Sequence, residues 1–163
     1  MMRWKRAFAV LVLSAATSST QADLPAKAVA SPMTVRAFRL GPGADLKKEL
    51  SRIARENDLR AGVVLTCVGS LTRAVIRLAD QPEATTFDGK HEIVSLVGTL
   101  APDGDHLHIA VSDSTGRTIG GHLMDGSLVY TTAEIAVGEL TAMAFSREAD
   151  PKTTYRELAI RKR

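Results

Sequence analysis

The spacing of apolar residues predicts one amphipathic helix in the first half of the chain. Four apolar residues follow one another at intervals of four, three and one positions: Leu46, Leu50, Ile53 and Ala54. Such intervals place side chains on one side of an α-helix, and the charged residues between them then cover the other sides. Asp45 directly precedes this stripe and is suited to cap the helix, which ends at Asn57 and Asp58.

The rest of the pattern is typical of β-strands. Short apolar runs and alternating apolar and polar residues recur between turn-forming residues such as Pro102-Asp103-Gly104. The strands predicted in this way cover residues 33–40, 62–68, 71–79, 91–100, 106–111, 118–124, 128–136, 139–146 and 155–160. One helix and short turns between strands favour an α+β fold, with a largely antiparallel sheet of about seven or eight strands.

The first residues have the layout of a secretory signal peptide. Arg3, Lys5 and Arg6 precede an apolar run over residues 7–16, and small or polar residues follow as far as Ala22. The apolar run is too short for a membrane span, which needs about 20 residues. We therefore predict cleavage after Ala22, a periplasmic or secreted protein, and no membrane span after cleavage.

Removal of residues 1–22 also sets the domain organisation and the charge balance. We predict a tether over residues 23–32 and a single folded domain over residues 33–163. The full chain has 21 Lys and Arg residues against 18 Asp and Glu residues, and three of the basic ones lie within residues 1–22, so that 18 of each sign remain. DNA-binding domains usually carry an excess or a stripe of positive charge, and this balance therefore disfavours nucleic acid as a partner.

Three of the four histidines lie close together in the sequence, at His106, His108 and His122. Residues two apart on a strand point to the same face, about 6.6 Å apart along the strand. If the turn is centred on Thr115, His108 pairs with His122 across a hairpin, and such partners bring their Cβ atoms within about 5.5 Å. The three imidazoles would then suit one divalent transition metal, zinc first, with nickel, copper or iron as other candidates. Calcium and magnesium prefer oxygen ligands.

A simpler interpretation of the histidines also has to be considered. Strand histidines often cover a half-buried surface, and a register slip by one residue would turn His122 to the other face. Gly120 and Gly121 precede His122 and favour a close approach of backbones, as a crowded site or a subunit contact requires, although glycines in a strand also mark bulges.

Several longer motifs together resemble a known family. They cover residues 38–45, 61–64, 69–71 with Arg77, 91–99, 106–113, Gly116, 120–123 and 139–140. In this combination they resemble the PPC domain, the plant and prokaryote conserved domain, over residues 34–148. The resemblance implies an α/β fold with an antiparallel sheet, usually assembled as a homotrimer. It also implies that His106, His108 and His122 bind a metal, as in prokaryotic members with the same histidine motifs.

The family resemblance also raises DNA binding, which the sequence disfavours. Plant members are nuclear proteins that bind AT-rich DNA, and bacterial relatives are often described as DNA-binding by similarity. In the plant proteins the contact comes from a hook of the Arg-Gly-Arg-Pro type outside the domain, and this chain has no such tripeptide core. The balanced charge and the predicted export point the same way.

Two classes of function therefore remain open from the sequence. The first is a metal-dependent enzyme acting on a small molecule, because an open three-histidine metal site can activate water or polarise a carbonyl or phosphoryl group. Such an enzyme needs a proton shuttle, for which Glu92 is the first candidate because it lies in a family motif; Glu134, Glu139 and Asp113 are others. The second class is a non-catalytic binding or assembly module with a structural metal.

Overall fold

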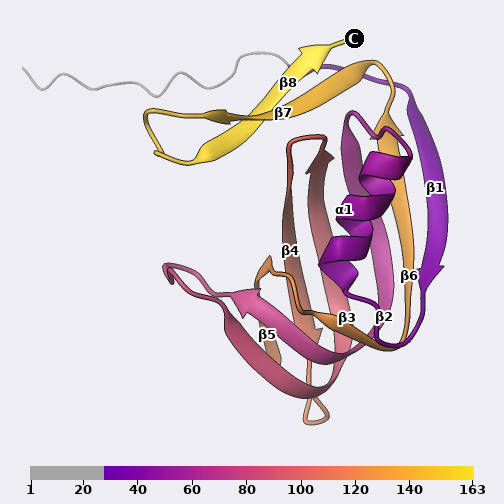
Figure 1. Ribbon diagram of the computed structural model, residues 1–163, viewed down its shortest axis with the longest axis vertical. Helices are drawn as coiled ribbons and strands as arrows, with labels where there is room; N and C mark the ends of the chain where they lie inside the picture. The colour runs from indigo at the N-terminus through magenta and orange to yellow at the C-terminus, as the bar shows by residue number, and fades with distance from the viewer. Residues whose placement is uncertain (1–27) are drawn as a thin grey trace, which may run out of the picture.

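The computed structural model describes residues 28–163, which form one helix and eight strands (Figure 1). In chain order the elements are β1 (Met33–Leu40), α1 (Leu46–Glu56), β2 (Gly62–Arg77), β3 (Thr85–Ala101), β4 (Gly104–Ser112), β5 (Thr118–Leu123), β6 (Leu128–Leu140), β7 (Met143–Ala149) and β8 (Arg156–Lys162). Every strand pairing is antiparallel, and the predicted α+β fold is confirmed.

Six of the strands form the main sheet, and the last two form a separate hairpin. The order in the main sheet is β1-β6-β2-β3-β4-β5, and the end of β2 pairs in addition with β5. This second pairing, Arg77 opposite His122, brings β5 back onto β2 and curls that edge of the sheet. The β7–β8 hairpin lies across the other end of the sheet, at the top of Figure 1.

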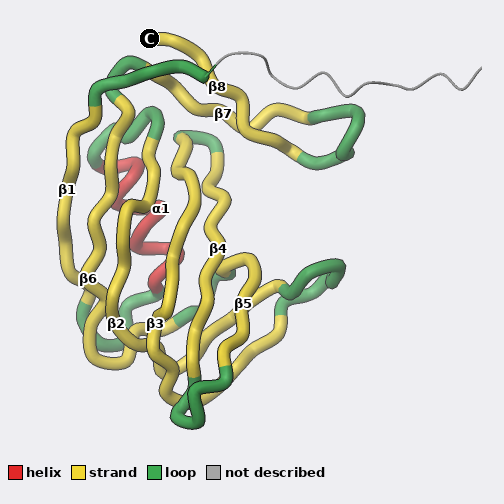
Figure 2. The backbone as a smooth tube through the Cα atoms, turned by 180° about the vertical axis from the view of Figure 1, so that it is seen from behind, coloured by secondary structure: helices red, strands yellow, loops and turns green. Residues whose placement is uncertain are grey.

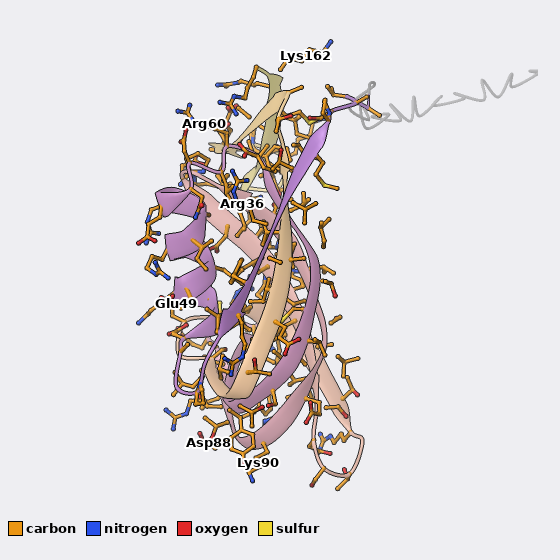
Figure 3. The ribbon with its side chains drawn as sticks, turned by 90° about the vertical axis from the view of Figure 1, so that its right-hand side faces the viewer. Arg36, Glu49, Arg60, Asp88, Lys90 and Lys162 are labelled. Carbon is orange, nitrogen blue, oxygen red and sulfur yellow. The ribbon has the colours of Figure 1, made fainter. Side chains whose placement is uncertain are left out.

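The hydrophobic core lies between α1 and one face of the main sheet. Leu46 and Leu50 of the helix are fully buried against sheet residues such as Leu71 and Ile76. The predicted cap is confirmed, because the Asp45 carboxylate accepts a hydrogen bond from the backbone N–H of Lys48 at 3.2 Å. Figure 3 shows the two layers from the side, with Glu49 of α1 pointing away from the sheet.

The opposite face of the main sheet is not covered by the helix, as Figure 2 shows from behind. Large apolar side chains are exposed on the strands of this sheet, namely Met33, Val35, Leu65, Val68, Val94 and Val97. We call Val35, Val68 and Val97 the open-face valines. Val97 is paired with His108, and His108 with His122, so the histidines lie at the β4–β5 end of this open face.

The structure corrects one predicted break, at Gly69-Ser70. Residues 62–77 form one continuous strand instead of two, with a shift of register at this point. Gly69 has φ +153°, and a Cβ atom there would lie 2.1 Å from the carbonyl oxygen of Thr132 on β6. The glycine therefore allows two strands to approach closely, and it does not end the strand.

Two further boundaries also differ from the prediction. The polar segment over residues 81–90 was predicted as a loop, but β3 begins at Thr85, because the far end of β2 continues and pairs Ile76 with Thr85. The predicted break at Gly138 is absent from β6, because Gly138 pairs with Val35 on one side and with Val63 on the other. In both cases pairing with a distant strand outweighs the local signal.

The structure describes only part of the two predicted N-terminal segments, the signal peptide and the tether. The predicted signal peptide, residues 1–22, lies outside the described residues. Part of the predicted tether contacts the fold, since Thr141 N–H donates to the Pro32 carbonyl at 3.0 Å and Ala142 N–H donates to Ser31 Oγ at 2.9 Å. Within residues 28–163, no helix has the length and apolar character that a membrane crossing requires.

Candidate metal centre

A tight turn sets the register of the strands that carry the three histidines. Asp113 N–H donates to the Arg117 carbonyl at 3.0 Å, and the Asp113 carboxylate accepts from the N–H groups of Thr115 and Arg117 at 2.8 and 3.1 Å. The hairpin that follows pairs His108 directly with His122. The predicted register, with the turn centred on Thr115, is confirmed.

Two glycines allow β5 to lie tightly between β4 and the end of β2. A Cβ atom on Gly120 would lie 2.9 Å from the Ile109 carbonyl oxygen, and one on Gly121 would lie 2.5 Å from the Arg77 carbonyl oxygen. Real side chains do not fit at such distances, and the nearest atoms belong to the backbone, whose displacement would disturb the strand pairing. The predicted close approach of backbones before His122 is therefore present.

The three imidazole rings converge at one point of the open face. The Nε2 atoms of His106 and His108 are 3.1 Å apart, and one ligand nitrogen from each of the three histidines lies within 4.8 Å of the others. The ring centroids are separated by 4.9, 5.0 and 4.4 Å. Two nitrogens that bind a tetrahedral zinc ion at about 2.0–2.1 Å lie roughly 3.3 Å apart, so the cluster fits such an ion with small side-chain adjustments.

The surroundings of the rings favour the neutral imidazole that a metal requires. Burial, then the charge of His108 and then that of Arg147 lower the pKa of His106 below its usual value of 6.5. Burial and the guanidinium group of Arg77 lower the pKa of His122 in the same direction. At neutral pH both rings therefore keep a free nitrogen lone pair.

An open cavity of about 520 Å³ lies beside the histidine cluster. His106 and His122 form part of its wall, and the remainder comes from β2, from the β3–β4 turn and from the β7–β8 hairpin. The charged residues on this wall are Arg77, Asp103, Asp105, Arg147, Arg156 and Glu157. A metal held by the histidines would thus be accessible to a small molecule in the cavity.

The family follows from a direct comparison of the sequence. Residues 27–141 match the model of the Plants and Prokaryotes Conserved (PCC) domain. The chain belongs to this family. The resemblance to the PPC domain, which is the same family, is confirmed.

Among curated proteins, the PCC domain described here is similar to part of a much longer protein. It is 48% identical over 157 residues to the bifunctional protein GlmU of Synechococcus sp. strain JA-3-3Ab, an alignment that covers 96% of this chain and 25% of that protein. A second GlmU, from Synechococcus sp. strain JA-2-3B'a(2-13), is 52% identical over 123 residues, with 76% of this chain and 20% of that protein covered. The chain therefore spans a quarter or less of the length of these relatives.

Solved structures share the fold of this PCC domain over most of its length. A hypothetical protein from Salmonella enterica superposes with a TM-score of 0.81 and 43% identity, covering 83% of this chain and 98% of that one. A metal-containing protein from Archaeoglobus fulgidus superposes with a TM-score of 0.68 and 24% identity, covering 82% of this chain and 99% of that one. A DNA-binding candidate from Bacteroides thetaiotaomicron superposes with a TM-score of 0.67 and 20% identity, covering 82% of this chain and 94% of that one. The last two show the fold alone.

The carboxylate predicted as a proton shuttle does not lie at the histidine cluster of the PCC domain. Glu92 pairs with Ser112 on β4, four residues from His108 and thus about 13 Å along the strand. It does not border the cavity. Among the other candidates, Asp113 holds the hairpin turn and Glu139 is paired with Arg36 at 3.2 Å.

The charged residues that do border the cavity were not identified as site residues from the sequence. Arg77 lies within a family motif, but nothing in its neighbourhood indicates a site. Arg147 and Glu157 come from the β7–β8 hairpin, which follows the six-stranded sheet in the sequence and reaches the histidines only in three dimensions. A local pattern carries no signal for such a contact.

Proposed function

We propose that this PCC domain binds one divalent transition metal, zinc first, through His106, His108 and His122. The convergence of three ligand nitrogens within 4.8 Å of one another carries the proposal. The donor set supports it further, because three neutral imidazoles suit zinc and its transition-metal neighbours and do not suit calcium or magnesium. That a protein of the same fold from Archaeoglobus fulgidus is described as metal-containing agrees with the proposal.

We propose further that the metal serves a small ligand, which makes a metal-dependent enzyme the leading function. A structural metal is usually enclosed by four protein ligands. Here the histidines number three, His106 and His108 are exposed, and two of the three border the cavity. A bound metal would supply Lewis-acid chemistry or an activated water in that position. The second candidate is a non-catalytic binding or assembly module, in which the metal orders the β4–β5 hairpin.

Elemental mass spectrometry tests the metal site directly. The full chain is expressed without a histidine tag, loaded with Zn²⁺, freed of excess metal and measured for metal per chain. We expect about one equivalent in the wild type and none in the triple variant His106→Ala, His108→Ala, His122→Ala. His91→Gln is the matched control, because His91 is the remaining histidine and lies outside the cluster. It is buried, and its Nδ1 atom is hydrogen-bonded with the Gly89 carbonyl. A wild type that stays metal-free would overturn the proposal.

We also propose that the domain assembles as a homotrimer through its open face. The open-face valines Val35, Val68 and Val97 are each more than half exposed. Large apolar side chains exposed on one face of a sheet are a common mark of a protein interface, and burial of each Å² of apolar surface contributes about 25 cal/mol. The chemistry of the face suits a second apolar sheet surface better than a charged partner.

Export and DNA binding are the remaining sequence expectations. Export to the periplasm or medium stays our proposal, tested by the mass of the N-terminus of protein recovered from the native host, where we expect Asp23 first. DNA binding is not favoured, although a protein of this fold from Bacteroides thetaiotaomicron is described as a candidate. The exposed valines of the open face offer no charge to neutralise phosphates.

A further inference from the structure

Arg147 of β7 is a buried cation for which the described residues supply no anionic partner. The residue is 8% exposed, and its Nε atom finds no hydrogen-bond partner in the described part of the chain. The guanidinium group donates from Nη2 to Thr99 Oγ1 at 2.5 Å, and within residues 28–163 no carboxylate lies at ion-pair distance from it. Buried polar groups are normally hydrogen-bonded and buried charges normally paired, so this arginine calls for a ligand.

A second arginine borders the same cavity. Arg77 extends from β2, where it pairs with His122, and is half-buried. Its guanidinium group makes one long hydrogen bond, from Nη1 to the Gln81 carbonyl at 3.4 Å. No carboxylate of the described residues lies at ion-pair distance from Arg77 either. Two arginines from separate sheets thus border one cavity with most of their donor groups free.

The other charges on the cavity wall are largely compensated by ion pairs. Asp103 is paired with Arg156 at 3.0 Å, and Asp105 is paired with Lys47 of α1 at 3.5 Å. Only Glu157 remains as a carboxylate of the wall without an ion-pair partner among the described residues. Two free cations therefore outnumber one free anion, before any metal adds its own positive charge.

We propose that Arg77 and Arg147 form an anion-binding subsite for the carboxylate or phosphate group of a small ligand whose other end reaches the histidine cluster. The contact with the cluster rests on the proposed metal function, whereas the arginine subsite does not. A guanidinium group presents N–H donors in a planar fork that matches the oxygens of a carboxylate or phosphate. The cavity volume of about 520 Å³ falls in the range of small-molecule sites.

Glu157 narrows the class of ligand. Its carboxylate borders the same cavity, and a second anionic group placed beside it would be repelled. The ligand therefore carries one anionic end, which the arginines bind, and a remainder that is neutral or donates hydrogen bonds. A hydroxy acid or a monophosphate ester has this composition.

Isothermal titration calorimetry on the metal-free full chain tests the arginine subsite without the metal. The probes are inorganic phosphate and glycolate, titrated separately, so that the two arms distinguish a phosphate ligand from a carboxylate one. We expect the wild type to bind at least one probe, and Arg147→Gln and Arg77→Gln each to weaken that binding about tenfold. Arg73→Gln is the control, because Arg73 lies on β2 but is exposed and paired with Asp88 at 2.6 Å.

The outcomes separate this proposal from the metal function. A wild type that binds neither probe, or arginine variants that bind like Arg73→Gln, would overturn the subsite. Binding that is lost in both arginine variants while the protein takes up no zinc would support the subsite and refute the metal. If Arg147→Gln fails to fold, as judged by circular dichroism, anion binding by the Arg77→Gln variant still tests the subsite, because Arg77 is only half-buried. Tighter glycolate binding after zinc loading, absent in the triple histidine variant, would support the ligand spanning both groups.

Discussion

His108 and His122 face each other across the β4–β5 hairpin, with their ring centroids 4.4 Å apart. This pairing depends on a register that a slip of one residue would destroy. Leu123, the next residue, is 2% exposed and belongs to the core on the other face. A slip would therefore bury a histidine and expose a leucine, and both changes cost free energy. The core thus holds the histidine cluster in register as much as the turn does.

The turn itself offers a first prediction, with Asp113→Ala. This substitution removes the hydrogen bonds from the N–H groups of Thr115 and Arg117 to the Asp113 carboxylate. We expect faster amide hydrogen exchange in the β4–β5 hairpin and weaker zinc binding, because the loosened turn lets His122 move relative to His108. Asp88→Ala is the control, since Asp88 is an exposed aspartate of β3, labelled near Lys90 in Figure 3, whose carboxylate is paired with Arg73 of β2. Equal zinc affinity in both variants would contradict the role given to the turn.

Gly121→Ala gives a second prediction, based on the close contact of β5 with β2. The added methyl group would lie 2.5 Å from the Arg77 carbonyl oxygen and 2.9 Å from Cγ2 of Ile76. We expect a loss of about 1–3 kcal/mol in the free energy of unfolding, measured in urea, together with weaker zinc binding. Gly41→Ala is the matched control, because nothing lies within 4 Å of its added Cβ. A variant as stable as this control would show that β5 relaxes away from β2 at little cost.

The pH dependence gives a third prediction. The pKa values of His106 and His122 are lowered in the folded protein, by burial first, so the unfolded chain binds more protons just below its own pKa of about 6.5. Stability therefore falls as the pH drops below that value, and protons also compete with the metal. We expect the melting temperature of metal-free wild type to fall more between pH 8 and pH 5.5 than that of the triple histidine variant. Parallel falls would show that other groups dominate the acid response.

The helix and the histidine hairpin could be predicted because their signals are local. The stripe from Leu46 to Ala54, the Asp45 cap and the turn at Asp113 each lie within a few residues of the structure that they determine. The predicted breaks at Gly69 and Gly138 failed for the opposite reason. A glycine in a strand marks both a break and a close crossing, and only the partner strand, β6 or β1, decides between them.

The cavity could not be predicted, because its residues meet through tertiary packing alone. Arg147 and Glu157 follow the histidines by more than 20 residues and reach them only because the β7–β8 hairpin folds over the end of the sheet. Arg147 is held there by its backbone N–H, which donates to the Asp103 carboxylate at 2.9 Å, and by Thr99. Glu92, by contrast, has a family motif around it but lies at another part of the sheet.

The open face gives a fourth prediction, with Val97→Asp. Val97 is 53% exposed on β3, one of the two middle strands of the main sheet, and lies next to His108 in the pairing of β3 with β4. If the face is buried between subunits, an aspartate there would leave an unpaired charge in the interface, and the trimer would dissociate. We expect light scattering after size exclusion to give three chains per particle for the wild type and one for the variant. Lys48→Glu is the control, because Lys48 is exposed on α1, and this variant should remain trimeric. A monomeric wild type would refute the proposed trimer.

Glu157→Gln gives the last prediction and tests the sign of the charge in the cavity. The Glu157 carboxylate borders the same space as Arg77 and Arg147, so it opposes any anion that these arginines attract. Its removal should tighten binding of phosphate or glycolate severalfold in calorimetry, the reverse of the effect of either arginine variant. The gain should shrink as salt is added, because screening weakens a repulsion between charges that are accessible to solvent.

Glu148→Gln is the matched control for this last prediction, since Glu148 is an exposed glutamate of β7 paired with Arg161. It should leave anion affinity unchanged. Weaker binding in Glu157→Gln would show that the carboxylate orients an arginine, and its repulsion of anions would then not limit the ligand class. An unchanged affinity would place the bound anion far from Glu157, and a ligand with two anionic groups would then fit the cavity as well.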